Sequence, residues 1–158
     1  MRQARGFSLI ELLIVVAIIL TIAAIAVPSY LRARIDANES GAVAALRTLN
    51  SAQITYNTAY PTVGYAGTLA SLGGTSCNPA SSSSACMVDT VLAGGYRSGY
   101  NFTLSGATGT PFSTYQIFGV PSLWNSSGIR YFCTFQDAVV RTSMTTIATC
   151  DATVAPLN

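Results

Sequence analysis

An unbroken apolar run near the N-terminus constrains the fold of this chain more than any other feature. Residues 12–27 are apolar with the single exception of Thr21. Counted from Phe7, the segment has 21 residues, about the length that crosses a bilayer as a helix. This length and the uniform hydrophobicity disfavour a helix buried in a soluble core. We therefore expect residues 7–30 to form a transmembrane helix.

Two other interpretations of this segment stay open at this point. The first is a secretory signal peptide, which is supported by the basic start and by the A-x-A pattern of residues 24–26, although signal peptides have shorter apolar runs. The second is a plain membrane anchor that is never cut. Arg2 and Arg5 favour a cytoplasmic start by the positive-inside rule. Arg32 and Arg34, on the far side of the run, partly oppose that orientation.

Glu11 favours a third interpretation of the same segment. A carboxylate within a membrane span costs about 2.5 to 3.5 kcal/mol at the centre, and less toward an end. Neither a signal peptide nor a plain anchor gains from it, so its presence indicates a function and a partner of opposite charge. The candidate partner is a new α-amino group at Phe7, created by cleavage after Gly6 and presented by a neighbouring subunit. Burying such a pair is tolerable, whereas burying either charge alone is not.

The run Arg5–Val16, with the sequence RGFSLIELLIVV, resembles the prepilin cleavage and methylation motif of type IV pilins and type II secretion pseudopilins. The resemblance implies that a membrane prepilin peptidase cuts after Gly6 and methylates Phe7. Residues 1–6 are then a leader peptide. The resemblance also implies that Glu11 directs the assembly of subunits into a filament.

The same resemblance implies a function and a location. Such subunits are single-pass proteins of the bacterial inner membrane, and they self-associate into a helical filament through an inner-membrane assembly platform and its ATPase machinery. A pilus at the cell surface serves adhesion, twitching motility and in some cases DNA uptake. The presence of Glu11 and a sizeable C-terminal region favour a major pilin of the type IVa kind. The alternative is a pseudopilin, which builds a periplasmic pseudopilus that drives protein export by a type II secretion system.

The charged residues argue against specific nucleic-acid binding and against catalysis. Without residues 1–6, six Arg face six acids, so the side-chain charge is zero, and no basic patch with interleaved aromatic residues is evident. Arg97 and Arg130 are assigned to strand edges that face solvent. The chain has no Lys, no His and no close pair of acids for acid–base work. We therefore expect a structural protein without a cofactor, not an enzyme.

After Pro28 the pattern changes from uniformly apolar to amphipathic. By the family resemblance, Pro28 marks a point where the helix bends or melts, since its ring removes one backbone hydrogen bond. We expect one helix over about residues 7–59, ended by Tyr60-Pro61, with residues 31–60 lying across a sheet. Apolar residues recur at helical spacing, interrupted by Gln53: Ile35, Ala42, Leu46, Leu49 and Tyr56. Polar residues are assigned to the opposite side: Asp36, Glu39, Arg47 and Asn50.

The remainder of the chain divides into a loop region and a sheet. Residues 61–98 are rich in Gly and Ser, with short helices expected around 68–72 and 87–92. From residue 99 onward, four segments rich in β-branched and aromatic residues predict strands with short connections: 100–104, 115–120, 129–135 and 139–144. The predicted fold is α+β, with the long N-terminal helix packed on a roughly four-stranded antiparallel sheet. Residues 99–158 hold that sheet and a disulfide-tied C-terminal region.

Four cysteines indicate structural disulfides if the segment that carries them is exported. Three pairings are compatible with the sequence. We favour the two local ones, Cys77 with Cys86 and Cys133 with Cys150, because each closes a short loop. We expect no metal site, because the sequence has no CxxC motif, no His and no clustered carboxylates.

Overall fold

The computed structural model describes residues 7–75 and 77–157, and the chain divides into two units, Met1–Arg34 and Ile35–Asn158. We call the described part of the first unit the N-terminal segment and the second unit the head. The expected leader, including Gly6, lies outside the described residues. One helix, α1 (Leu9–Ala59), supplies residues to both units. The long helix predicted over residues 7–59 is therefore confirmed, and it begins two residues later.

The C-terminal end of α1 follows from Pro61. A residue that precedes proline is disfavoured in the helical region, and Tyr60 is the first residue beyond the helix. The Tyr60 carbonyl accepts hydrogen bonds from the backbone N–H groups of Val63 (2.9 Å) and Gly64 (3.0 Å). These bonds turn the chain away from the helix axis and into the loop region.

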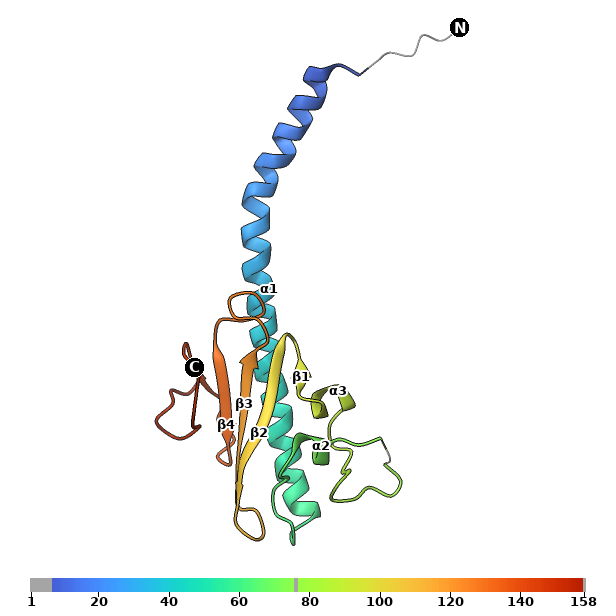
Figure 1. The fold of residues 1–158 in the computed structure, drawn as a ribbon, viewed down its shortest axis with the longest axis vertical. Helices are drawn as coiled ribbons and strands as arrows, with labels where there is room; N and C mark the ends of the chain where they lie inside the picture. Colours follow the sequence, from blue (N-terminus) through green and yellow to red (C-terminus); the bar gives the residue numbers. More distant parts are fainter. Residues whose placement is uncertain (1–6, 76, 158) are drawn as a thin grey trace. The chain divides into compact units, whose positions relative to one another are not determined.

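The head contains one antiparallel sheet beside α1 (Figure 1). Its strands follow one another in space in the order of the sequence: β1 (Tyr96–Arg97), β2 (Tyr100–Thr108), β3 (Thr114–Pro121), β4 (Tyr131–Phe135) and β5 (Arg141–Ser143). The α+β architecture is confirmed, with five strands where roughly four were predicted. The additional strand, β1, lies inside the segment assigned to loops, and its two residues are too few to show a period of two.

Burial alternates along the central strand β3, as expected for a sheet with one face on a helix. In β3 every second residue, beginning with Tyr115, is buried, and the residues between are half-buried. Tyr115 and Ile117 of β3 are fully buried, as is Tyr100 of β2. These side chains belong to the same apolar core as Leu46 and Leu49 of α1. The head is thus held together by packing between the second half of α1 and the inner face of the sheet.

Two short helices occupy the loop region near the places expected from the sequence. They are α2 (Leu69–Leu72) and α3 (Thr90–Ala93). Each begins after a capping side chain: the Thr68 hydroxyl accepts a hydrogen bond from Ser71 N–H, and the Asp89 carboxylate accepts from the N–H groups of Val91 and Leu92. Leu72 and Leu92 are fully buried in the core, so both helices tie the loop region to the head.

Candidate membrane and assembly site

The N-terminal segment has no covering layer of its own. Every described side chain from Phe7 to Arg34 is exposed except Ala23, which is half-buried. By length and composition α1 is able to cross a membrane, with a mean hydropathy of 3.0 over its most apolar window, although a signal sequence meets the same criterion. So much exposed apolar surface requires lipid or other protein around it.

Glu11 lies in the first turn of α1 and accepts a hydrogen bond from the backbone N–H of Ser8, with 3.0 Å between that nitrogen and Oε2. The Ser8 carbonyl in turn accepts from Leu12 N–H (3.3 Å), which makes Ser8 the N-cap residue. In a capping box, the side chain of the third helical residue accepts a hydrogen bond from the N–H group of the N-cap residue. The contact of Glu11 with Ser8 is this half of the motif. Glu11 therefore satisfies a helix-end donor within its own chain, while Oε1 has no hydrogen-bond partner among the described residues.

The capping role of this pair was missed in the sequence analysis, which considered only the charge of Glu11. The pattern Ser8-x-x-Glu11 was visible in the sequence, because serine followed three residues later by glutamate and an apolar run is the usual sign of a helix start. The exposed side chain of Phe7 lies immediately before this cap. The structure thus brings Phe7, Ser8 and Glu11 together at one helix end.

Two further residues of the segment have local backbone roles. Thr21 donates its hydroxyl hydrogen to the Ile18 carbonyl (2.8 Å), so its polar group is satisfied within the helix. Pro28 lies inside α1, which continues on both sides of it. Its ring leaves the Ala24 carbonyl without the usual helical donor. The bend or melting expected at Pro28 stays a prediction.

In the head, Glu39 differs from the sequence prediction. It was assigned to the polar, exposed side of the helix, but only 4% of it is exposed. Its Oε1 accepts from the N–H groups of Ile129 (2.9 Å) and Arg130 (3.0 Å), and its Oε2 is 2.6 Å from Arg130 Nε. Burial alone would raise the pKa of Glu39, but these hydrogen bonds and the Arg130 charge outweigh it and lower the pKa below 4.5. Arg130, assigned to a solvent-facing strand edge, is likewise held in this pair.

The spacing of the helix could have revealed this buried carboxylate. Seven of the ten buried positions of α1 follow one line with steps of four and three residues: 35, 39, 42, 46, 49, 53 and 56. Glu39 falls on this line, as does Gln53, whose side chain exchanges two hydrogen bonds with the backbone of Ala66. Assigning positions by polarity alone placed Glu39 on the wrong side.

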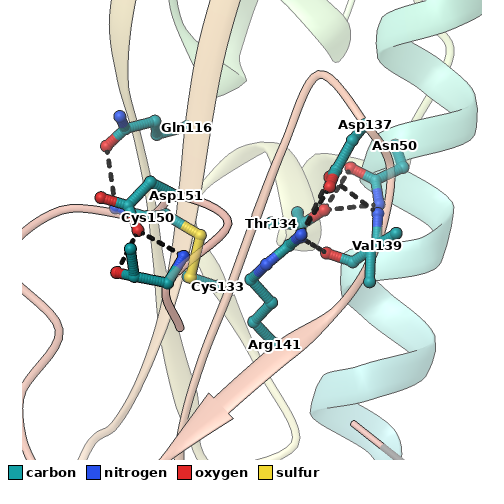
Figure 2. Close-up of a disulfide and its surroundings, with 10 residues drawn as sticks. Asn50, Gln116, Cys133, Thr134, Asp137, Val139, Arg141, Cys150 and Asp151 are labelled. Atoms are coloured by element: carbon teal, nitrogen blue, oxygen red, sulfur yellow. Dashed lines mark hydrogen bonds and ion pairs between the residues drawn. A yellow bond between two sulfur atoms is a disulfide. The ribbon is translucent and has the colours of Figure 1, made fainter. Parts of the chain in front are cut away.

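Asn50, also assigned to the polar side, is buried between α1 and the sheet. Its Nδ2 donates to Thr134 Oγ1 (2.9 Å) and to the Ala138 carbonyl (3.1 Å), and its Oδ1 accepts from the Tyr115 hydroxyl (3.2 Å). Figure 2 shows Asn50 directed from α1 toward Thr134 of β4. Burial raises the pKa of Tyr115, so its phenol stays protonated as a donor. This network fixes the position of α1 along the inner face of the sheet.

Two disulfides join the four cysteines in the local pairing, Cys77 with Cys86 and Cys133 with Cys150. In Figure 2 the Cys133–Cys150 bridge ties β4 to the C-terminal tail. Cys133 and Thr134 point to opposite faces of β4, as neighbours in a strand do. The tail thus covers the outer face of β4 while α1 covers the inner one, which accounts for the burial of both residues.

Within the described ranges, three ion pairs join residues of the head: Arg97 with Asp89, Arg130 with Glu39, and Arg141 with Asp137. Figure 2 shows the last of these beside the Asn50 network. In the same part of the chain, no group of three or more His, Cys, Asp or Glu is placed to hold a metal ion.

The comparisons with known proteins concern mainly the N-terminal part. The prokaryotic N-terminal methylation motif matches residues 1–27. The chain is also similar to the type IV wide pilus major component PilA4 of Thermus thermophilus, with 58% identity over 40 residues. That match covers 25% of this chain and 30% of the relative, and no solved structure matches. The N-terminal part of this chain is therefore that of a type IV pilin-like protein with a prepilin methylation motif.

Proposed function

We propose that this chain is the structural subunit of a type IV pilus filament, anchored in the inner membrane before assembly. The observation that carries the proposal is a helix of exposed apolar residues whose first turn, with the Ser8–Glu11 cap, lies inside the matched methylation motif. The similarity to a protein named as a major pilus component supports a pilus over a pseudopilus. The chain acts by self-association and not by catalysis.

Maturation follows from the same motif. The prepilin peptidase cuts after Gly6 and methylates the new N-terminus at Phe7. The cut leaves Phe7 exposed, one residue before the cap that starts α1. An α-amino group at this position carries a positive charge, and it has no acid nearby in sequence except Glu11.

Glu11 has two tasks in this account. Its Oε2 caps the helix of its own chain by accepting from Ser8 N–H. Its Oε1 is left to accept from the Phe7 amine of a neighbouring subunit as helices stagger in the filament core. The pair forms in apolar surroundings, where an unpaired charge would be strongly destabilising. Self-association therefore fixes the axial register of neighbouring helices as well as holding them together.

Glu11→Gln separates the two tasks, because glutamine keeps the capping acceptor and loses the charge. We expect the variant to be cleaved and inserted normally, and the yield of sheared filaments to fall at least about tenfold, which corresponds to about 1.4 kcal/mol per contact. Thr21→Val is the matched control. It removes the one polar side chain of residues 12–27, whose hydrogen bond stays within its own helix, and it should assemble normally.

Normal filaments from Glu11→Gln would show that capping, and not charge, is what the carboxylate supplies. Failure of both variants would indicate that assembly tolerates no change in this segment. A pseudopilin would behave differently in the wild type: the processed chain would be found in membranes and secretion would require it, while sheared surface fibres would lack it. The assembly platform and its ATPase are the further partners of either filament.

A further inference from the structure

We propose that the turn between β3 and β4 docks the head on the lipid headgroup surface of the membrane that holds α1, before the subunit enters a filament. We call residues 122–128 the Trp124 loop. The inference rests on the proposed membrane anchoring of the N-terminal segment. It concerns two side chains of the head, Leu123 and Trp124.

Both side chains are largely exposed, Leu123 at 66% and Trp124 at 61%. Ile129, just beyond the loop, is 36% exposed. Trp124 is the one tryptophan of the whole chain. Single exposed apolar residues are common on protein surfaces and mean little by themselves. Here, however, two large apolar side chains are adjacent at the tip of a turn.

The Trp124 loop is held rigid by its own hydrogen bonds. The Leu123 carbonyl accepts from the N–H groups of Ser126 (3.1 Å) and Ser127 (2.9 Å), and Asn125 N–H donates to the Gly128 carbonyl (2.9 Å). The Ser127 hydroxyl accepts from Leu123 N–H (3.0 Å). Because the backbone is fixed, the apolar side chains are presented to the outside without an entropic cost of ordering the loop on contact.

The loop is attached to the part of α1 where the chain enters the head. Asn38 Nδ2 donates to the Ser127 carbonyl (2.9 Å), and Glu39 binds the backbone of Ile129 (2.9 Å). Asn38 and Glu39 are among the first residues of the head, which begins at Ile35. In sequence, the apolar run ends only shortly before this point. The Trp124 loop therefore lies at the end of the head that the membrane-crossing chain enters.

A lipid surface fits this loop better than a second copy of the chain does. Tryptophan is enriched at membrane–water interfaces, where its apolar ring and its N–H group are both satisfied. A stable protein–protein interface buries about 1,200 to 2,000 Å², far more than two side chains provide. A lipid contact needs no such area, because α1 already supplies the anchoring. Arg32 and Arg34, which precede the head in sequence and form no ion pair among the described residues, suit anionic headgroups.

The single tryptophan allows a direct test with the full chain. We would reconstitute it in vesicles of phosphatidylcholine and phosphatidylglycerol, with acyl chains brominated near the headgroup, and measure the quenching of Trp124 emission. The matched control is Ile54→Trp in a Trp124→Phe background. Ile54 is 52% exposed on α1, and it lies 15 residues after Glu39, about 22 Å along the helix. We expect the fractional quenching of Trp124 to be at least about three times that of Trp introduced at position 54, because an interfacial side chain enters only about 5 to 10 Å into the lipid.

Equal quenching at the two positions, or none at either, would overturn the docking. Protection of Trp124 from acrylamide that grows with the protein-to-lipid ratio, without quenching by brominated lipid, would assign the loop to contact with a second copy instead. Flotation of the vesicles separates this inference from the proposed function. A chain that does not float with the vesicles contradicts the anchoring itself and the docking with it, whereas flotation without quenching contradicts only the docking.

Discussion

The two halves of α1 show two different ways in which a helix can be stabilised. In the N-terminal segment, Ile14 is 55% exposed and Ile25 is 79% exposed, so the described residues leave these apolar side chains largely uncovered. In the head, Leu46 and Leu49 of the same helix are fully buried against the sheet. The first half therefore depends on its surroundings, whereas the second depends on a core that the chain itself provides.

The comparison also bears on which part of the chain is similar to known proteins. The methylation motif matches residues 1–27, and the match to PilA4 covers 40 residues, or 25% of the chain. The head has its own buried polar contacts, such as Glu39 with Arg130 and Asn50 with Thr134. In the proposed filament, the N-terminal segment is constrained by its contacts with identical helices, while the head is constrained mainly by its own packing.

Truncating one large residue in each half gives the largest expected contrast. Leu46→Ala should lower the free energy of unfolding of the head by about 2 to 5 kcal/mol, because it leaves a cavity in a close-packed core. Ile14→Ala should leave that free energy unchanged. Denaturant titration of the full chain in detergent, followed by Trp124 fluorescence, measures both. Equal losses would show that the two halves unfold as one unit.

The disulfides sharpen the comparison within the head. Cys133 and Cys150 close a loop with a sequence separation of 17 and are almost fully buried, whereas Cys77 is exposed and the separation from Cys86 is 9. Replacing both Cys133 and Cys150 by Ala should destabilise the head by about 3 kcal/mol from loop entropy. Mild reductant should open the exposed Cys77–Cys86 bridge first, as mass mapping of alkylated cysteines would show. Reduction of the buried bridge first would contradict this order.

Glu39 makes the stability of the head depend on pH. Its pKa is lowered in the folded state, so its contribution is present above the unfolded value near 4.5 and is lost as the pH falls through the folded value. Glu39→Gln should cost about 1 to 3 kcal/mol at neutral pH, because glutamine cannot serve both backbone donors and the Arg130 guanidinium. The difference in the free energy of unfolding between the wild type and Glu39→Gln should disappear as the pH falls below 4.5. A difference that is constant with pH would contradict a charged Glu39 in the folded head.

The smallest effect is expected at an exposed ion pair of the head. Arg97 Nη1 lies 2.6 Å from Asp89 Oδ2, but each side chain is 49% exposed. Arg97→Ala should change the free energy of unfolding by less than about 1 kcal/mol. Arg130→Ala, which leaves buried Glu39 without its charged partner, should cost clearly more in the same titration. Equal losses in the free energy of unfolding would mean that burial does not determine how much each ion pair stabilises the head.

Much of the fold follows from local sequence patterns. The apolar run, Tyr60-Pro61 and the β-branched segments predicted the long helix and most of the sheet, because each of these patterns acts over a few residues. The pairing of Glu39 with Arg130 spans 91 residues, and no local pattern shows that a loop will supply three donors to one carboxylate. Its burial alone was predictable, since Glu39 continues the spacing of Ile35 and Ala42. The Ser8–Glu11 cap was predictable too, from its spacing.

The central claim is that this chain is cut after Gly6 and built into a filament. Intact-mass analysis of filaments sheared from the cells that make it tests this most directly. The account predicts a dominant species that begins with N-methylated Phe7 and is lighter by four hydrogens than the reduced chain, as two disulfides require. A mature chain that begins at Val27, after the A-x-A pattern of residues 24–26, would contradict it and indicate an ordinary secreted protein.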